Sequence, residues 1–142
     1  FALNNDDGLS TKNYDHADII LTGVSRSGKT PTCLFLALQY GIYAANYPLI
    51  DEDLDSVKLP SVLKPFKNKL YGLSINPVRL QNIRGERRSN SGYASIEQCQ
   101  KEVRRAEDMY VQNNVPFIDT SHISIEEIAG RILQKSKLER RY

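Results

Sequence analysis

The sequence has no tryptophan, one methionine, two cysteines and no apolar run long enough to cross a membrane. Cys33 and Cys99 form no C-x-x-C pair and have no histidine at metal-ligand spacing. This pattern favours two free thiols in a reducing compartment, and we therefore expect a cytoplasmic protein. The 17 acidic residues nearly balance the 19 lysines and arginines, so bulk charge favours neither nucleic acid nor a membrane as a partner.

The remaining composition is that of an ordinary globular domain. Of the 142 residues, 40% are hydrophobic and 25% are charged, which is enough for one compact core. The first 16 residues are polar, and the chain begins with Phe1 rather than with Met. We interpret residues 1–16 as an arm or linker from a missing N-terminal domain, and residues 17–142 as the folded domain.

Apolar runs alternate with amphipathic stretches along this domain. The run at residues 19–21 is typical of a strand buried on both faces. Further strands are expected at 42–50, 68–75 and 115–119. Helices are expected after the first strand, after the cap Asn76, from Ser95 to about Gln112, and from Ser124 onwards. The longest helix has a core stripe at Ile96, Cys99, Val103, Ala106 and Tyr110. This alternation predicts an α/β fold with a parallel sheet of about four strands flanked by helices.

The stretch "GVSRSGKT" fits the phosphate-binding pattern G-x-x-x-x-G-K-[ST] at every required position. We expect Gly23 and Gly28 to adopt positive φ, so that the amides of residues 24–29 point at phosphate oxygens. Lys29 supplies a charge for the terminal phosphates, and the Thr30 hydroxyl is placed to bind Mg²⁺. The nucleotide-binding residues are thus predicted to be Gly23, Val24, Ser25, Arg26, Ser27, Gly28, Lys29 and Thr30.

The alternative is a chance match in a glycine-containing turn. The context favours phosphate binding because an apolar strand precedes the loop and a helix follows it. Pro31 disfavours a helical conformation for the residue before it, so the helix could begin one residue late. The pattern predicts that residues 17–142 form a P-loop nucleotide-binding catalytic domain with a P-loop kinase-like sheet.

Polar side chains follow the expected strands, where parallel sheets bind their ligands. Asp51 and Asp53 follow the second strand, Asn76 the third, and Asp119 and Thr120 the fourth. Asp51 is the best candidate for a base on the acceptor side or for metal support, because phosphoryl transfer needs such an acid. The alternative is that residues 51–55 form a solvated acidic loop.

Arginines continue the inward stripe of the helix after Asn76. Arg84 and Arg87 each lie four residues after an apolar side chain, Leu80 and Ile83 respectively, so the protein-facing stripe becomes cationic. Guanidinium groups suit phosphate, and Arg84 and Arg87 are predicted to be catalytic cations. Surface arginines paired with neighbouring carboxylates are the alternative.

Three further residues have roles that the sequence leaves open. Arg26 could contact a phosphate or a protein acceptor from within the loop. Gly85 indicates a helix break or a mobile lid. His122 is interpreted as a loop histidine rather than a catalytic one.

Four separated blocks of the sequence resemble a known family. They are "ADIILTGVSRSGKTPTCLFLALQYGIYAANYPLI", "KLYGLSINPVRLQNIRGERR", "YASIEQCQKEV" and "VPFIDTSHISIEEIA". In this order they look like the bifunctional kinase–pyrophosphorylase family, which includes the regulators of phosphoenolpyruvate synthase and of pyruvate, phosphate dikinase. Family members have a further N-terminal region, so the resemblance implies that this chain is the C-terminal catalytic part.

The resemblance implies two reactions. In one, ADP donates its β-phosphoryl group to a threonine of the target enzyme, which inactivates the target and releases AMP. In the other, inorganic phosphate attacks the phosphothreonine, which releases pyrophosphate and restores activity. The family's nucleotide loop falls on Gly23 to Thr30, with another small residue common at Gly28. The family pattern identifies no acid: Asp51 and Asp119 are inferred from their position, and relatives differ at Asp119.

The residues of these blocks resemble the regulators of phosphoenolpyruvate synthase more than those of pyruvate, phosphate dikinase, so the resemblance implies the synthase as the target. ADP, inorganic phosphate and Mg²⁺ are the small molecules expected at the site. The sequence leaves open whether the protein forms a homodimer. A P-loop kinase of a small metabolite and a non-catalytic nucleotide-sensing module remain as alternatives, the first because "VPFIDTSHISIEEIAGRIL" also resembles the end of nucleoside monophosphate and shikimate kinases.

Overall fold

A four-stranded, all-parallel sheet forms the centre of the molecule, in the strand order β2-β1-β3-β4. The computed structural model describes residues 14–87 and 92–136. The strands are β1 (Ile19–Gly23), β2 (Ala44–Pro48), β3 (Leu70–Ser74) and β4 (Phe117–Asp119). The predicted α/β fold with a parallel sheet of about four strands is confirmed.

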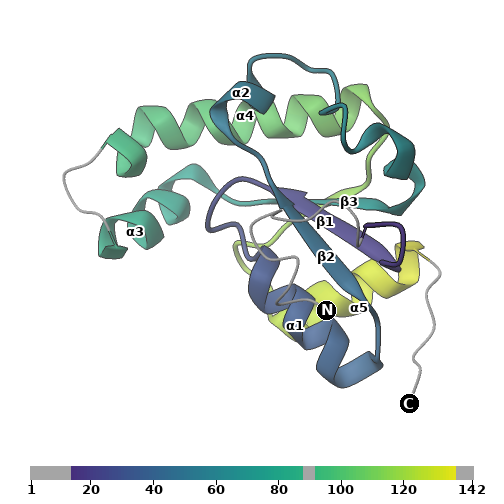
Figure 1. Ribbon diagram of the computed structural model, residues 1–142. Coiled ribbons are helices and arrows are strands. Elements are labelled where there is room, and N and C mark those ends of the chain that lie inside the picture. Colours follow the sequence, from purple (N-terminus) through teal and green to yellow (C-terminus); the bar gives the residue numbers. More distant parts are fainter. Residues whose placement is uncertain (1–13, 88–91, 137–142) are drawn as a thin grey trace.

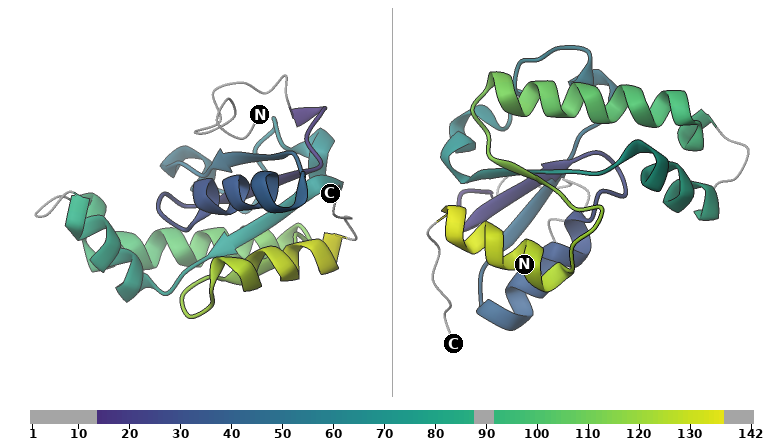
Figure 2. Two further views of the ribbon diagram at one scale, coloured as in Figure 1. Left: turned by 90° about the horizontal axis from the view of Figure 1, so that it is seen from below. Right: turned by 180° about the vertical axis from the view of Figure 1, so that it is seen from behind.

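Helices cover both faces of this sheet (Figure 1). They are α1 (Lys29–Tyr40), α2 (Asp51–Leu54), α3 (Pro77–Arg87), α4 (Ile96–Gln112) and α5 (Ile125–Ser136), with short 3-10 helices η3 (Lys64–Lys69) and η4 (Gly92–Ala94). The two views in Figure 2 place α1 and α5 on one face, and α3 and α4 on the other. The core accordingly divides into two clusters of buried side chains, one on each face.

The buried character of the strands agrees with the expectation, but the lengths of several strands do not. All five residues of β1 and of β3 are buried, as the continuous apolar run predicted. However, β2 ends at Pro48, and residues 64–69 form a 3-10 helix, so these two strands are shorter than 42–50 and 68–75. The fourth strand, expected at 115–119, begins only at Phe117. Proline lacks the N–H that continues a sheet, which explains the end of β2.

The predicted helix ends are formed by the expected side chains. The Asn76 carboxamide oxygen accepts a hydrogen bond from the Val78 amide at 2.8 Å, and the Ser95 hydroxyl accepts one from Gln98 at 3.2 Å. Gly85 does not break α3, which continues to Arg87. The acidic stretch after β2 begins with the short helix α2 rather than a loop.

The core stripe of α4 is confirmed from Cys99 onwards, and it includes a buried carboxylate at Glu102. Tyr110 lies on this stripe against β3, with its hydroxyl 2.9 Å from the carbonyl oxygen of Leu73. Its ring occupies the space that a Cβ on Gly72 would need. Tyr14, within the stretch interpreted as an arm, is also buried in this core, and its hydroxyl donates to the Asn46 carbonyl oxygen at 3.0 Å.

Candidate functional site

The glycine-rich loop, residues 23–30, joins the end of β1 to the start of α1. Gly23 lies in the strand and does not have a positive φ, so that part of the prediction is wrong. A Cβ on Gly23 would lie 2.6 Å from the Ser27 hydroxyl oxygen and 2.9 Å from the Leu73 carbonyl oxygen. Glycine is therefore required here because the loop folds back closely on β1 and β3.

Positive φ occurs later in the loop. Gly28 has a φ of 104° and caps α1, as predicted. Arg26, a non-glycine residue, has a φ of 73°, which is uncommon and strained for an L-residue. The helix begins at Lys29, so Pro31 is accommodated within its first turn and does not delay the start.

The carbonyl oxygen of Val24 is the internal anchor of the loop. It accepts hydrogen bonds from the Ser27 hydroxyl at 2.8 Å, from the Ser27 amide at 3.2 Å and from the Lys29 ammonium at 2.8 Å. The Ser27 amide is thus used inside the loop, and not every amide of residues 24–29 points outwards as expected. Lys29 is 7% exposed, so its charge lies within the loop.

The two acids after β2 have different surroundings. Asp53 caps α2 by accepting a hydrogen bond from the Ile50 amide at 3.1 Å, and it also accepts one from the Tyr47 hydroxyl at 3.4 Å. Burial, with the Asp53 carboxylate nearby, raises the pKa of Tyr47. Asp51 is exposed and accepts a hydrogen bond from the Gln98 amide nitrogen at 3.2 Å. Of the two carboxylates, Asp51 is the more exposed.

The ends of β3 and β4 are joined by polar contacts. Asp119 accepts hydrogen bonds from the Ser121 hydroxyl at 2.5 Å and from the Ser121 amide at 2.8 Å. The Ser121 hydroxyl oxygen in turn accepts one from the Asn76 amide at 2.7 Å. Asp119 therefore organises the turn after β4, while the Asn76 side chain caps α3.

Thr120 connects this turn to the glycine-rich loop. Its hydroxyl oxygen lies 3.1 Å from the carbonyl oxygen of Ser27 and 3.1 Å from that of Ser74. Its amide donates to the same Ser74 oxygen at 2.9 Å. The residues at the carboxyl ends of β3 and β4 are thus connected to the glycine-rich loop through Thr120.

Arg84 points inwards, as the spacing predicted, and is fully buried. Its guanidinium group forms a two-pronged ion pair with Glu102 of α4, at 2.8 and 3.1 Å. It also donates to the Ser25 carbonyl oxygen at 3.0 Å. The anion beside Arg84 is therefore a carboxylate of the protein itself, and the arginine contacts the loop rather than the solvated surface.

Other predicted residues are placed less centrally. Arg26 and His122 are exposed. Arg87 ends α3, but its side chain and all of Arg88 lie outside the described residues. Cys33 and Cys99 are buried free thiols, as expected.

Sequence reasoning missed Gln98 and Glu102. The Gln98 amide nitrogen donates to Glu102 at 2.8 Å and to Asp51 at 3.2 Å. A signal was present, since Glu102 falls between Cys99 and Val103 on the apolar stripe of α4. Buried charged side chains are usually paired, so an acid on the buried stripe of one helix and Arg84 on that of another indicate an ion pair.

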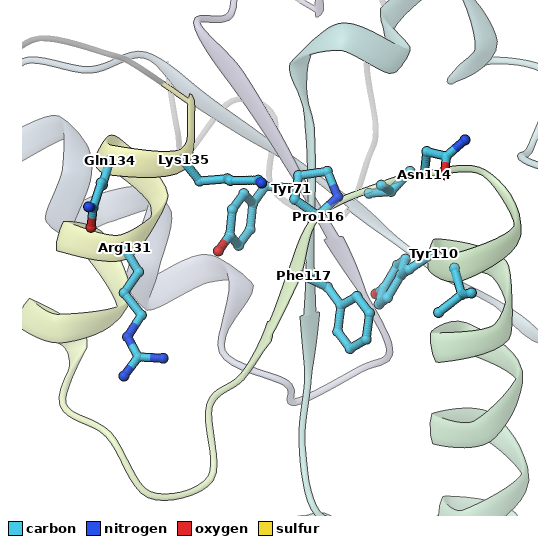
Figure 3. Close-up of a pocket in the computed structure, with 10 residues that line it drawn as sticks. Tyr71, Tyr110, Asn114, Pro116, Phe117, Arg131, Gln134 and Lys135 are labelled. Carbon is cyan, nitrogen blue, oxygen red and sulfur yellow. The ribbon is translucent and has the colours of Figure 1, made fainter.

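Two cavities lie in different parts of the molecule. One of about 540 Å³ opens beside Asp51, Ser95 and Gln98. Another, of about 740 Å³, lies at the opposite end of the sheet, where β3 and β4 begin (Figure 3). Tyr71, Phe117 and residues of α5 line this second cavity, which is therefore remote from the glycine-rich loop.

Within the described ranges, no three or more His, Cys, Asp or Glu side chains form a group that could hold a metal ion. None of the helices in that part of the chain combines the length and the apolar character that crossing a bilayer requires.

A parallel sheet whose first strand leads through a glycine-rich turn into a helix is common among phosphate-binding α/β proteins. The chain belongs to the kinase/pyrophosphorylase family, whose model matches residues 1–133. This confirms the resemblance found in the sequence.

Over all 142 residues, the chain is 60% identical to a protein of Neisseria gonorrhoeae (strain NCCP11945), 59% identical to one of Dichelobacter nodosus (strain VCS1703A) and 58% identical to one of Laribacter hongkongensis (strain HLHK9). Each carries the provisional name of a phosphoenolpyruvate synthase regulatory protein. The chain covers 52% of each relative, and so spans about half the length of the curated relatives it matches.

Proposed function

We propose that this chain is the catalytic part of a bifunctional regulator of phosphoenolpyruvate synthase. It transfers the β-phosphoryl group of ADP to a threonine of the target, and it also removes that group with inorganic phosphate. The observation that carries this proposal is the position of Lys29, whose ammonium lies inside a glycine-rich loop at the carboxyl edge of the sheet. Family membership and the names of the relatives support it.

One loop can serve both directions. In phosphorylation, the bond between the β-phosphorus and the bridging oxygen of ADP breaks, the threonine oxygen bonds to that phosphorus, and AMP leaves. In the other reaction, an oxygen of inorganic phosphate bonds to the phosphorus of phosphothreonine, and the bond from that phosphorus to the threonine oxygen breaks. The threonine oxygen takes up a proton, and the pyrophosphate formed leaves the site. Both reactions pass a phosphoryl group between a threonine oxygen and a phosphate oxygen, so the Lys29 charge stabilises the same transition-state oxygens.

Asp51 is the proposed acid of the acceptor side. Its exposed carboxylate borders the 540 Å³ cavity, where a threonine hydroxyl could approach it and give up its proton. The Thr30 hydroxyl is a hard oxygen donor that suits Mg²⁺, which would neutralise phosphate charge when bound. Mg²⁺ usually takes most of its ligands from phosphates and water, so one hydroxyl from the protein fits such an ion.

The cations form a second part of the proposal. Arg26 is exposed within the loop, and it is proposed to contact a phosphate or the protein acceptor. Arg87 is proposed as a further phosphate contact. Arg84 acts through the loop that it contacts.

The proposed target is phosphoenolpyruvate synthase, with pyruvate, phosphate dikinase as the less favoured one, in the cytoplasm. The test incubates the chain, with any sequence that naturally flanks it, with purified phosphoenolpyruvate synthase and β-labelled ADP. Label on a target threonine, released as pyrophosphate on addition of inorganic phosphate, is the expected result. Transfer from ATP to a small acceptor would establish a metabolite kinase instead, and nucleotide binding without transfer would establish a sensing module.

A further inference from the structure

Arg84, Glu102, Gln98 and Asp51 form one continuous polar chain that ends on the glycine-rich loop. Arg84 is 0% exposed and Glu102 is 8% exposed. Both guanidinium amino groups bond to Glu102, and one of them also donates to the Ser25 carbonyl oxygen at 3.0 Å. The buried carboxylate therefore fixes the direction in which the arginine faces the loop.

A buried ion pair is a weak source of stability, because desolvation of the two charges offsets most of their attraction. Well-packed apolar side chains of similar volume often stabilise a core as well. What apolar side chains cannot do is donate a hydrogen bond to Ser25. The Arg84–Glu102 pair therefore differs from an apolar pair in that it holds the glycine-rich loop in place through the bond to Ser25.

A second branch leaves the same carboxylate. The Gln98 amide nitrogen lies 2.8 Å from Glu102 Oε2 and 3.2 Å from Asp51 Oδ1. An amide nitrogen carries two hydrogens, so it can donate to both oxygens at once. Glu102 thus sits between the phosphate side and the acceptor side of the proposed site.

We propose that Glu102 and Gln98 are positioning residues that set the glycine-rich loop and Asp51 relative to each other. Glu102 orients Arg84, which holds the loop at Ser25, and Gln98 orients the Asp51 carboxylate. The catalytic consequence rests on the proposed function, whereas the effect of Glu102 on the loop does not.

The first experiment replaces the pair together, as Arg84→Met with Glu102→Met, in the chain with any natural flanking sequence. Because no buried charge is left unpaired, we expect a folded protein with a melting temperature near that of the wild type. Hydrogen exchange of the loop amides should become faster, and ADP affinity measured by calorimetry should fall about tenfold or more. A folded double variant with wild-type loop exchange and ADP affinity would overturn the proposal.

Arg105→Met is the matched control. Arg105 also donates to a backbone carbonyl, that of Leu54 at 3.0 Å, and lies 3.7 Å from the Asp55 carboxylate. It connects α4 to α2 rather than to the loop, so loop exchange should not change. Exchange needs neither nucleotide nor target, so this readout stays valid even if the ADP reaction is absent.

Arg84→Lys covers the case in which the double variant does not fold. Lysine keeps the charge for Glu102 but lacks the planar fork that bonds the carboxylate and Ser25 together. We expect faster loop exchange and weaker ADP binding, and wild-type values for both would contradict the positioning role.

Gln98→Leu tests the other branch. Turnover should fall while ADP affinity stays unchanged, and the same substitution should add nothing in an Asp51→Asn background. Full turnover in Gln98→Leu, alongside a defective Asp51→Asn, would show that Gln98 does not position the acid. If Asp51→Asn itself retained full turnover, the role proposed for Asp51 would be wrong instead.

Discussion

The hydroxyl oxygen of Thr120 lies 3.1 Å from the carbonyl oxygen of Ser27, so the residue after β4 contacts the centre of the glycine-rich loop. The two residues are 93 positions apart in the chain. The contact makes the loop dependent on the last strand of the sheet, and not only on the strand and helix that it joins.

Thr120→Val should loosen the loop. Valine keeps the shape of threonine but removes the hydroxyl, which costs about 1 kcal/mol in the free energy of unfolding and leaves the Ser27 oxygen without this contact. We expect weaker ADP binding, measured by calorimetry. Thr120→Ser keeps the hydroxyl and is the matched control, and equal affinities of the two variants would contradict the expected role.

Lys29→Ala should abolish both proposed reactions. Removing a preorganised cation from a phosphoryl-transfer site is expected to lower each rate by about a hundredfold or more. The measurements are label transfer from ADP to the target and release of pyrophosphate from the phosphorylated target. The exposed Lys58→Ala serves as the control. An intact phosphate-dependent reaction in Lys29→Ala would rule out a single shared site.

Asp51→Asn should lower turnover in the ADP direction by about a hundredfold or more, because an amide cannot accept the threonine proton. The variant keeps a side chain of the same size, so nucleotide affinity should change little. Glu52→Gln removes the same charge from the next exposed residue of α2 and should retain activity. Equal turnover in the two variants would return the acids of α2 to a solvated surface role.

Gly23→Ala should destabilise the protein by about 1–3 kcal/mol, because the added Cβ would lie 2.6 Å from Ser27 and 2.9 Å from the backbone of Leu73. Gly130→Ala is the opposite case. It adds a methyl group to the exposed face of α5 with nothing within 4 Å, and should stabilise the helix by about 0.5–1 kcal/mol. Urea unfolding measures both changes, and a neutral Gly23→Ala would contradict the close packing of the loop.

Alkaline pH should destabilise the fold through Tyr14. Burial, with smaller contributions from Tyr47 and Cys33, raises the pKa of Tyr14 from 10.0 to about 12. The unfolded chain therefore loses this proton first. The stabilisation is complete below pH 10 and is lost as the pH rises towards 12, by about 1.4 kcal/mol per pH unit. Urea unfolding over this range should show a shallower fall in Tyr14→Phe, with the exposed Tyr43→Phe unchanged in slope.

Local patterns predicted much of this protein, because they depend on near neighbours in the chain. The spacing of Leu80 and Arg84 correctly predicted that the arginine faces the protein interior. The alternation of apolar runs and helices predicted the parallel sheet. Asn76 and Ser95 cap the helices that follow them, since a cap acts within one helical turn.

The same patterns were wrong about Gly23 and silent about Glu102. The positive φ expected at Gly23 occurs at Arg26, because Gly23 is still part of the strand and is required for close packing instead. The spacing of Arg84 shows which way its side chain faces but not which groups it contacts. The ion pair with Glu102 and the hydrogen bond to Ser25 were therefore not predicted.

By itself, the sequence determined the class of fold, the loop that follows the first strand, the inward faces of α3, α4 and α5, and the family. It did not determine the inward face of α1, where Leu38 is expected on the core stripe but is exposed and Leu36 is buried instead. Tertiary structure alone decided that Glu102 pairs with Arg84, that Thr120 supports the loop, and that Asp51 is exposed while Asp53 caps α2. The physical reason is that these contacts join residues far apart in the chain, so they depend on how strands and helices pack.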